Sequence, residues 1–176
     1  MATIDDLQAA FNGESNARVK YLAYAKKADE EDYGKVASLI RAAAAAEEVH
    51  ARNHERVIKR MGGNAQATIA PVDVKSTRDN LAAAIQGEVY ERDVMYPGFI
   101  KAAAGNRDAT HTFQDALAGE KEHARLYQQA LSNLEQRRGG KQDFWVCPVC
   151  GYTTEVAPGA DCPVCGAKKE KFKLVN

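Results

Sequence analysis

Long apolar runs, an excess of charge of either sign and an N-terminal basic region are all missing from this chain. Its 24 Lys and Arg residues balance its 24 Asp and Glu residues, so bulk charge does not draw it to nucleic acid or an anionic membrane. No apolar stretch reaches the roughly 18 residues of a spanning helix, and residues 1–7 lack the pattern of a signal peptide. We expect a cytoplasmic protein that binds neither nucleic acid nor membrane.

Cysteine is absent from the first 146 residues, and all four cysteines lie in two Cys-Pro-Val-Cys-Gly repeats near the end of the chain. Clustered cysteines without an export signal favour a metal site over disulfides. Residues 144–176 are too few to bury much core unaided, so a metal is the expected staple. The spacing alone leaves zinc and iron open. The expected ligands are Cys147, Cys150, Cys162 and Cys165.

Apolar residues recur at helical spacing through most of the remaining chain. We expect a mainly α fold, a four-helix bundle of the ferritin-like kind, with helices over residues 3–31, 35–61, 78–104 and 108–137. The long connection 62–77 favours a crossover between parallel helices over a tight hairpin. Pro97 lacks an amide proton, so it predicts a kink in the third helix.

The change in composition near residue 139 predicts two domains of unequal size. The first, residues 1–138, holds the four helices. Residues 139–143, which contain a Gly-Gly pair, form a short flexible linker. Residues 144–176 form a small β and loop domain around the four cysteines.

Carboxylates and imidazoles lie on the apolar stripes of the predicted helices, where an unpaired charge costs several kcal/mol. The second and fourth helices each carry a Glu-x-x-His pair, whose members share one helical face. One such pair is weak evidence, since Glu is common on exposed faces, but two pairs with three further stripe carboxylates favour a di-metal site. Mixed carboxylate and imidazole ligands suit iron or manganese. The candidate ligands are Glu14, Glu47, His50, Glu88, Glu91, Glu120 and His123.

The other histidines and neighbouring acids have plainer interpretations. His54 lies on the same stripe as His50, and we expect a core or ligand-supporting histidine, although the pair also has zinc-ligand spacing. His111 lies near a helix start and is expected at the surface. The remaining acids, which fall off the stripes and are expected in solvent, are Glu48, Glu55 and Glu122.

Taken together, these motifs resemble the rubrerythrin family across essentially the whole chain. The cysteine domain resembles a rubredoxin with a shortened span between its two knuckles. The matching helical motifs are Gly13-Glu14, Glu47-x-x-His50, Gly87-Glu88-x-x-Glu91, Met95-Tyr96-Pro97-Gly98-Phe99 and Glu120-Lys121-Glu122-His123.

The resemblance implies a ligand arrangement for two irons in the bundle and one iron in the four-cysteine site, where zinc is possible as isolated. Glu47 and Glu120 would bridge, with Glu14 on one iron and Glu88 and His123 on the other. Glu91 and His50 would alternate on the first iron with its oxidation state. Tyr21 and Tyr96 match family tyrosines near the centre, although a plain core role is an equal alternative.

The resemblance also implies an NAD(P)H-linked peroxidase that reduces hydrogen peroxide to water in oxidative-stress defence. Electrons would arrive from a reductase or rubredoxin through the iron of the four-cysteine site. The family is typically a homodimer in which one subunit's cysteine domain faces the other's di-iron site, and some members swap helices. A higher homo-oligomer is also open.

Two other functions compete with this one. A ferroxidase or iron-handling protein of the ferritin class would use the bundle but has no evident need of the cysteine domain. A non-enzymatic scaffold or sensor would carry zinc alone at its cysteines.

Overall fold

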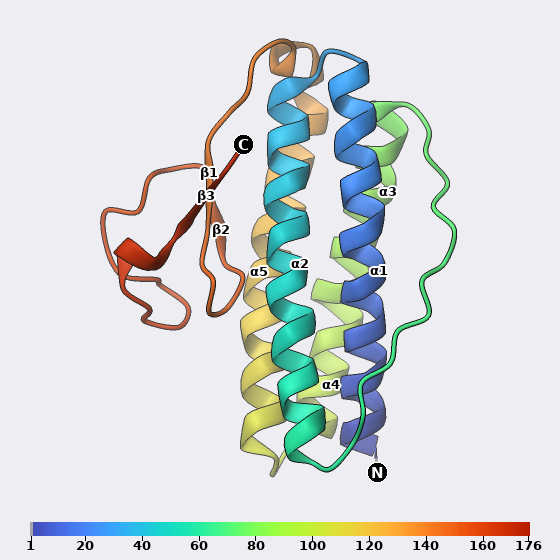
Figure 1. Ribbon diagram of the computed structural model, residues 1–176, viewed down its shortest axis with the longest axis vertical. Coiled ribbons are helices and arrows are strands. Elements are labelled where there is room, and N and C mark those ends of the chain that lie inside the picture. The colour runs from blue at the N-terminus through green and yellow to red at the C-terminus, as the bar shows by residue number, and fades with distance from the viewer. Residues whose placement is uncertain (1) are drawn as a thin grey trace.

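The computed structural model describes residues 2–176 as a helical bundle with a small domain against its side (Figure 1). The long elements are α1 (Ala2–Glu30), α2 (Gly34–Arg60), α3 (Thr77–Tyr90), α4 (Tyr96–Ala102) and α5 (Arg107–Ser132). Together they form the expected ferritin-like four-helix bundle, in which α3 and α4 belong to one helical rod. Within residues 2–176, no helix combines the length and apolarity needed to cross a membrane.

The connection between α2 and α3 is the predicted crossover. It runs the length of the bundle along the outside of α1, so α2 and α3 point the same way (Figure 1). Polar side chains of α1 hold it in place, since Asn12 Oδ1 accepts the Thr68 amide at 2.9 Å and Asn16 Oδ1 accepts the Ala70 amide at 2.8 Å. Ser76 then caps α3 by accepting the Asp79 amide, as its residue type predicts.

The third helical rod differs in detail from the prediction. A π-helical turn, Glu91–Met95, separates α3 from α4, and the Tyr96 amide bonds the Glu91 carbonyl. Pro97 has no amide to offer Asp93, and the wider turn directly before it is how the rod absorbs that loss. The predicted fourth helix is shorter than expected: α5 ends at Ser132, and a 3₁₀ turn, Leu134–Arg137, follows it.

Two apolar clusters fill the bundle. One lies toward the α1–α2 turn and includes Tyr24, Leu39 and Leu126, and the other lies toward the opposite end and includes Leu7, Ile58 and Phe113. All six side chains are buried. The polar stripe residues of the sequence fall between these two clusters, so packing on both sides fixes the helices that carry them.

The small domain, hereafter the cysteine module, is a three-stranded antiparallel sheet with loops. Its strands are β1 (Phe144–Val146), β2 (Thr153–Thr154) and β3 (Lys173–Val175), in the order β2-β1-β3. Trp145 pairs with Thr154 on one side and Leu174 on the other. Phe144 is fully buried in the first apolar cluster of the bundle, so the module lies against the helices, not apart from them.

Candidate metal centres

Six of the seven predicted bundle ligands meet at mid-height of the bundle. They form two overlapping groups, each with donor atoms within 4.8 Å of one another. All six side chains are almost completely buried, with exposed fractions of 0–1%. The first group is Glu14, Glu47, His50 and Glu120, and the second is Glu47, Glu88, Glu120 and His123.

The two groups share Glu47 and Glu120, one from each Glu-x-x-His motif. His50 Nδ1 lies 2.9 Å from Glu47 Oε2 and 3.0 Å from Glu120 Oε1. His123 Nδ1 lies 2.9 Å from Glu120 Oε2 and 3.3 Å from Glu47 Oε1. The helical spacing therefore puts both carboxylates between both imidazoles, which is the geometry of two neighbouring cation positions with shared ligands.

The charges in this centre perturb one another strongly. Burial and the charge of Glu120 raise the pKa of Glu88 to about 8. Burial opposes a charge on His50, but Glu120 and Glu47 outweigh it and raise its pKa to about 10. Burial, followed by Glu120 and Glu47, also raises the pKa of Glu14. Without cations, the centre therefore holds protons that metal ions would displace.

Buried carboxylate oxygens also show that the residues fit metal ions. Oxygens of this kind normally find a hydrogen-bond partner inside a protein. Four of them here have no partner in hydrogen-bond geometry among the described residues, although imidazole nitrogens lie near, and two divalent cations would satisfy all four. They are Glu14 Oε2, Glu47 Oε1, Glu88 Oε2 and Glu120 Oε1.

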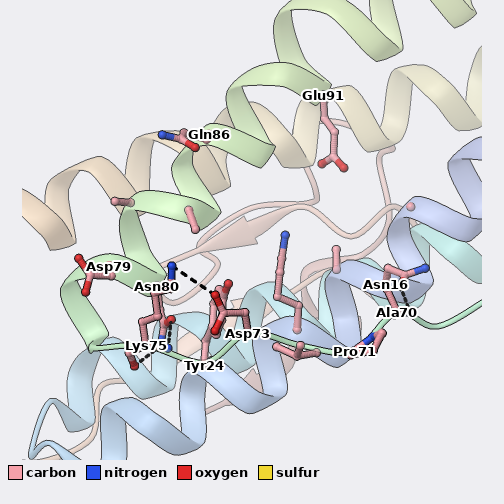
Figure 2. Close-up of a pocket in the computed structure, with 16 residues that line it drawn as sticks. Asn16, Tyr24, Ala70, Pro71, Asp73, Lys75, Asp79, Asn80, Gln86 and Glu91 are labelled. Carbon is pink, nitrogen blue, oxygen red and sulfur yellow. Dashed lines mark hydrogen bonds and ion pairs between the residues drawn. The ribbon is translucent and has the colours of Figure 1, made fainter.

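The seventh predicted ligand, Glu91, lies outside both groups. It is half-buried on the π-helical turn and lines a cavity of about 480 Å³ between α1, α3 and the crossover (Figure 2). Burial and the charges of Glu88 and Glu120 raise the pKa of Glu91, so it lies within electrostatic reach of the centre. Its place as a metal ligand stays a prediction.

Tyrosines surround the centre. The Tyr21 hydroxyl donates to Glu88, and the Tyr96 hydroxyl donates to Glu14. Both side chains are buried, so the predicted proximity of the two tyrosines to the centre holds. Tyr127, one turn after His123, is a third buried tyrosine that was not among the predicted site residues; its ring lies 5.6 Å from that of Tyr21, edge to face. Its spacing from His123 was the available signal.

His54 supports Tyr96 and is outside both metal-binding groups. Its Nε2 lies 3.1 Å from the Tyr96 oxygen, and its Nδ1 lies 3.1 Å from Thr112 Oγ1. Since Tyr96 gives its proton to Glu14, His54 donates from Nε2 and accepts the Thr112 hydroxyl at Nδ1. Burial and the charge of His50 lower the pKa of His54 to about 3, which agrees with a neutral ring.

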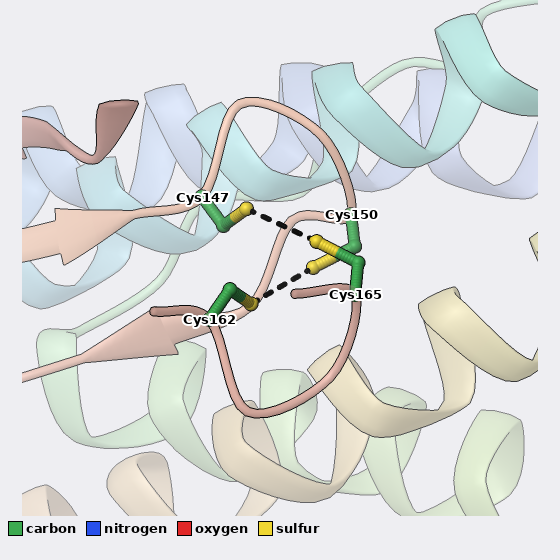
Figure 3. Close-up of side chains that lie close together, drawn as sticks. All are labelled: Cys147, Cys150, Cys162 and Cys165. Carbon is green, nitrogen blue, oxygen red and sulfur yellow. Dashed lines mark hydrogen bonds between the residues drawn. The ribbon is translucent and has the colours of Figure 1, made fainter. Parts of the chain in front are cut away.

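The four cysteines converge as predicted, in the arrangement that Figure 3 shows. Cys147 Sγ lies 3.7 Å from Cys165 Sγ, and Cys150 Sγ lies 3.6 Å from Cys162 Sγ. Hydrogen bonding from Cys150 and from backbone amides lowers the pKa of Cys147 to about 5. Four sulfurs at this spacing, one already favouring the thiolate, form a tetrahedral metal site.

The first knuckle of the module touches the bundle centre, a contact that no sequence signal predicted. Asn53 donates to the Val149 carbonyl at 2.8 Å, and Thr153 Oγ1 lies 3.2 Å from His123 Nε2. Gly151 packs on His50 so closely that a Cβ there would lie 2.2 Å from Nε2. The module thus faces the centre of its own chain, whereas the family resemblance implies a partner's; the homodimer stays a prediction.

Comparison with known proteins agrees with this description. The Rubrerythrin family model matches residues 5–131, and the rubredoxin-like domain of rubrerythrin matches residues 145–173. Rubrerythrin-2 of Clostridium acetobutylicum is 37% identical, over 97% of this chain and 95% of the relative. Nigerythrin of Nitratidesulfovibrio vulgaris is 36% identical, over 97% and 85%.

Solved structures extend the match to three dimensions. Fully reduced, all-ferrous nigerythrin superposes with a TM-score of 0.89 at 35% identity, over 98% of this chain and 86% of that one. A bacterioferritin from Desulfovibrio desulfuricans shares the fold alone, with a TM-score of 0.71 at 22% identity, over 76% and 80%. The donor sets fit two irons in the bundle and one at the cysteines. The chain therefore belongs to the rubrerythrin family of di-iron oxidative-stress proteins.

Proposed function

We propose that this protein is a peroxidase, which reduces hydrogen peroxide to water with electrons that pass through the iron of its cysteine module. The observation that carries the proposal is the position of the module: Gly151 of its first knuckle packs on His50, and Thr153 of β2 contacts His123. Iron storage has no evident need of a one-electron carrier beside the bundle centre. A peroxidase needs one, because its buried centre must be reduced again after each peroxide.

The reaction takes two electrons and two protons for each peroxide, breaks its O–O bond and yields two water molecules. The bound irons would supply the electrons. Glu91 and His50 would alternate at one of the two irons in the bundle, and the iron of the cysteine module would be reduced by a reductase or rubredoxin that draws on NAD(P)H. The remaining ligands in the bundle would be Glu14, Glu47, Glu88, Glu120 and His123. The ligands in the module would be Cys147, Cys150, Cys162 and Cys165.

The chain's own residues then handle approach and protons. The cavity that Glu91 lines would admit a small polar molecule as far as Glu91 (Figure 2). Tyr21 and Tyr96 each hold a hydroxyl proton on a carboxylate of the centre. Burial and the nearby carboxylates raise the pKa of both tyrosines, so each stays protonated and orients its carboxylate.

A single-turnover titration tests the proposal. Iron-quantified, anaerobically reduced protein receives substoichiometric hydrogen peroxide, with dioxygen in a parallel run, while the iron spectra are followed. We expect complete oxidation at about one peroxide per di-iron pair, because each peroxide accepts two electrons. We also expect this oxidation to be faster than oxidation by dioxygen. Fast reaction with dioxygen and slow reaction with peroxide would instead show ferroxidase chemistry, and zinc without iron would leave a scaffold.

A matched pair of variants ties the reaction to the bundle centre. Glu47 is buried and shared by both groups, whereas its neighbour Glu48 is exposed on the same helix. Glu47→Gln should abolish oxidation by peroxide, and Glu48→Gln should leave it unchanged. Equal effects of the two substitutions would contradict the placement of the reaction.

A further inference from the structure

His123 and His50 differ in what holds the ring nitrogen that points away from the carboxylates. Thr153, which is fully buried on β2 of the cysteine module, places its Oγ1 3.2 Å from His123 Nε2. His50 Nε2 has no hydrogen-bond partner among the described residues. At that nitrogen the module presents Gly151, whose missing side chain makes room for the ring.

The direction of the Thr153 bond follows from a count of protons. Thr153 Oγ1 donates its single hydrogen to the Gly151 carbonyl at 3.1 Å. The same oxygen can therefore only accept at His123, which means that His123 Nε2 carries a proton. The unprotonated nitrogen of a neutral His123 is then Nδ1, which lies 2.9 Å from Glu120 and 3.5 Å from Glu88.

We infer that Thr153 is a positioning residue of the bundle centre, which fixes the tautomer and ring orientation of His123 so that Nδ1 faces the metal. Hydrogen bonds to the outer nitrogen of a metal-binding histidine set both properties. The module leaves Nε2 of His50 without such a bond, so the two Glu-x-x-His halves differ: a hydrogen bond orients the outer nitrogen of His123, and only packing surrounds that of His50. The inference rests on the di-iron part of the proposed function and not on the choice of oxidant.

Substitution of Thr153 separates the hydroxyl from packing. Thr153→Val keeps the shape of the side chain and removes the acceptor, whereas Thr153→Ser keeps the acceptor. Thr154→Val is the matched control, because the neighbouring Thr154 hydroxyl bonds the Val156 backbone. All variants are tested as full-length protein with iron at the cysteines, whose absorbance reports an intact module.

The measured quantities are the ferrous-ion affinity of the bundle, by anaerobic competition with a chelator, and the reduction potential of the di-iron centre. Thr153→Val should weaken the affinity by about tenfold to hundredfold. It should also raise the potential, since an imidazole without its acceptor is a poorer donor to ferric iron. Thr153→Ser and Thr154→Val should stay close to the unsubstituted protein. Thr153→Val with unchanged affinity and potential, or equal losses in Ser and Val, would overturn the inference.

A second measurement uses the unsubstituted protein, so it tests the inference even if Thr153→Val fails to fold. Nitrogen NMR of histidine-labelled, zinc-substituted protein identifies which ring nitrogen of His123 carries a proton. We expect Nε2 to be protonated, with slow exchange because the site is buried. A proton on Nδ1 would overturn the inference and leave the peroxide titration above unaffected.

Discussion

The bundle centre and the cysteine module both gather metal ligands, but they differ in how far apart those ligands lie in the sequence. Two knuckles separated by a short loop supply all four thiolates. The bundle centre takes its ligands from four helices, from Glu14 to His123, and its shape exists only when those helices are packed. The difference teaches that each site depends on a different source of stability: metal for the module and apolar packing for the bundle.

Cys150→Ser should have the largest effect, because it removes a ligand of the electron carrier and no residue of the bundle. We expect steady-state peroxide turnover to fall to the level seen without an electron donor. One round of oxidation at the bundle should remain, since that centre is complete without the module's iron. Steady-state and single-turnover kinetics on the same preparation check this. Unchanged steady-state turnover from a rubredoxin-dependent donor would disprove the electron route.

Removal of metal should affect the cysteine module and the bundle differently. Metal binding at structural zinc sites supplies on the order of 10 kcal/mol of folding free energy in small domains, so the module should lose its order without metal. The bundle should stay helical on its two apolar clusters. Fluorescence of Trp145, which lies on β1 of the module, reports the first change, and far-ultraviolet circular dichroism reports the second. Simultaneous loss of both signals would show that the two units fold as one.

Glu91→Ala should sharpen the description of the bundle centre, because Glu91 lies outside both ligand groups. We expect the peroxide step to slow by about tenfold to hundredfold, the usual cost of losing a residue that supports a metal site. Helicity and ferrous-ion affinity should be nearly unchanged. Glu88→Ala is the comparison, and it should lose affinity because Glu88 belongs to a group. Rapid-mixing kinetics and metal analysis distinguish the two, and equal affinities would contradict the grouping.

Glu31→Gln should have the smallest effect, because it changes the contacts of a single side chain that lies away from both metal sites. Glu31 Oε2 accepts the Thr77 amide at 2.8 Å, where α3 begins. That bond is the largest of several contributions, with the Thr77 side chain and Lys27 among the others, that lower the pKa of Glu31 from 4.5 to about 2. A lowered pKa stabilises the fold above the unfolded value and loses its effect as pH falls through the folded value. The substitution should cost about 1 kcal/mol at pH 7.

The cost should shrink as pH falls from 4.5 toward 2, where Glu31 becomes neutral as well. Urea unfolding of metal-free protein at several pH values measures it. The exposed neighbour Glu30 provides the control, since Glu30→Gln should be nearly neutral throughout. A cost for Glu31→Gln that is independent of pH would show that packing, not charge, joins α1 to α3.

Much of the fold could be predicted because local rules agree with it. The apolar periodicity predicted all four helical rods. Ser76, a residue type that favours helix N-caps, caps the third rod. The effect of Pro97 was predicted as a kink, but its form was not, since a π-helical turn depends on how the neighbouring helices hold the rod. The end of α5 was placed five residues too late, because helix ends depend on tertiary contacts that periodicity does not contain.

The sequence by itself determined which residues can bind metal. A carboxylate and an imidazole three positions apart on an apolar helical face cannot be buried together without compensation, and two Cys-x-x-Cys knuckles offer little but a tetrahedral site. Only the tertiary structure decided that Glu91 lies beside the centre, on a cavity, and that Thr153 and Gly151 of a distant module reach His123 and His50. Those contacts join surfaces far apart in the chain, and their positions follow from the packing of whole elements, which no local pattern encodes.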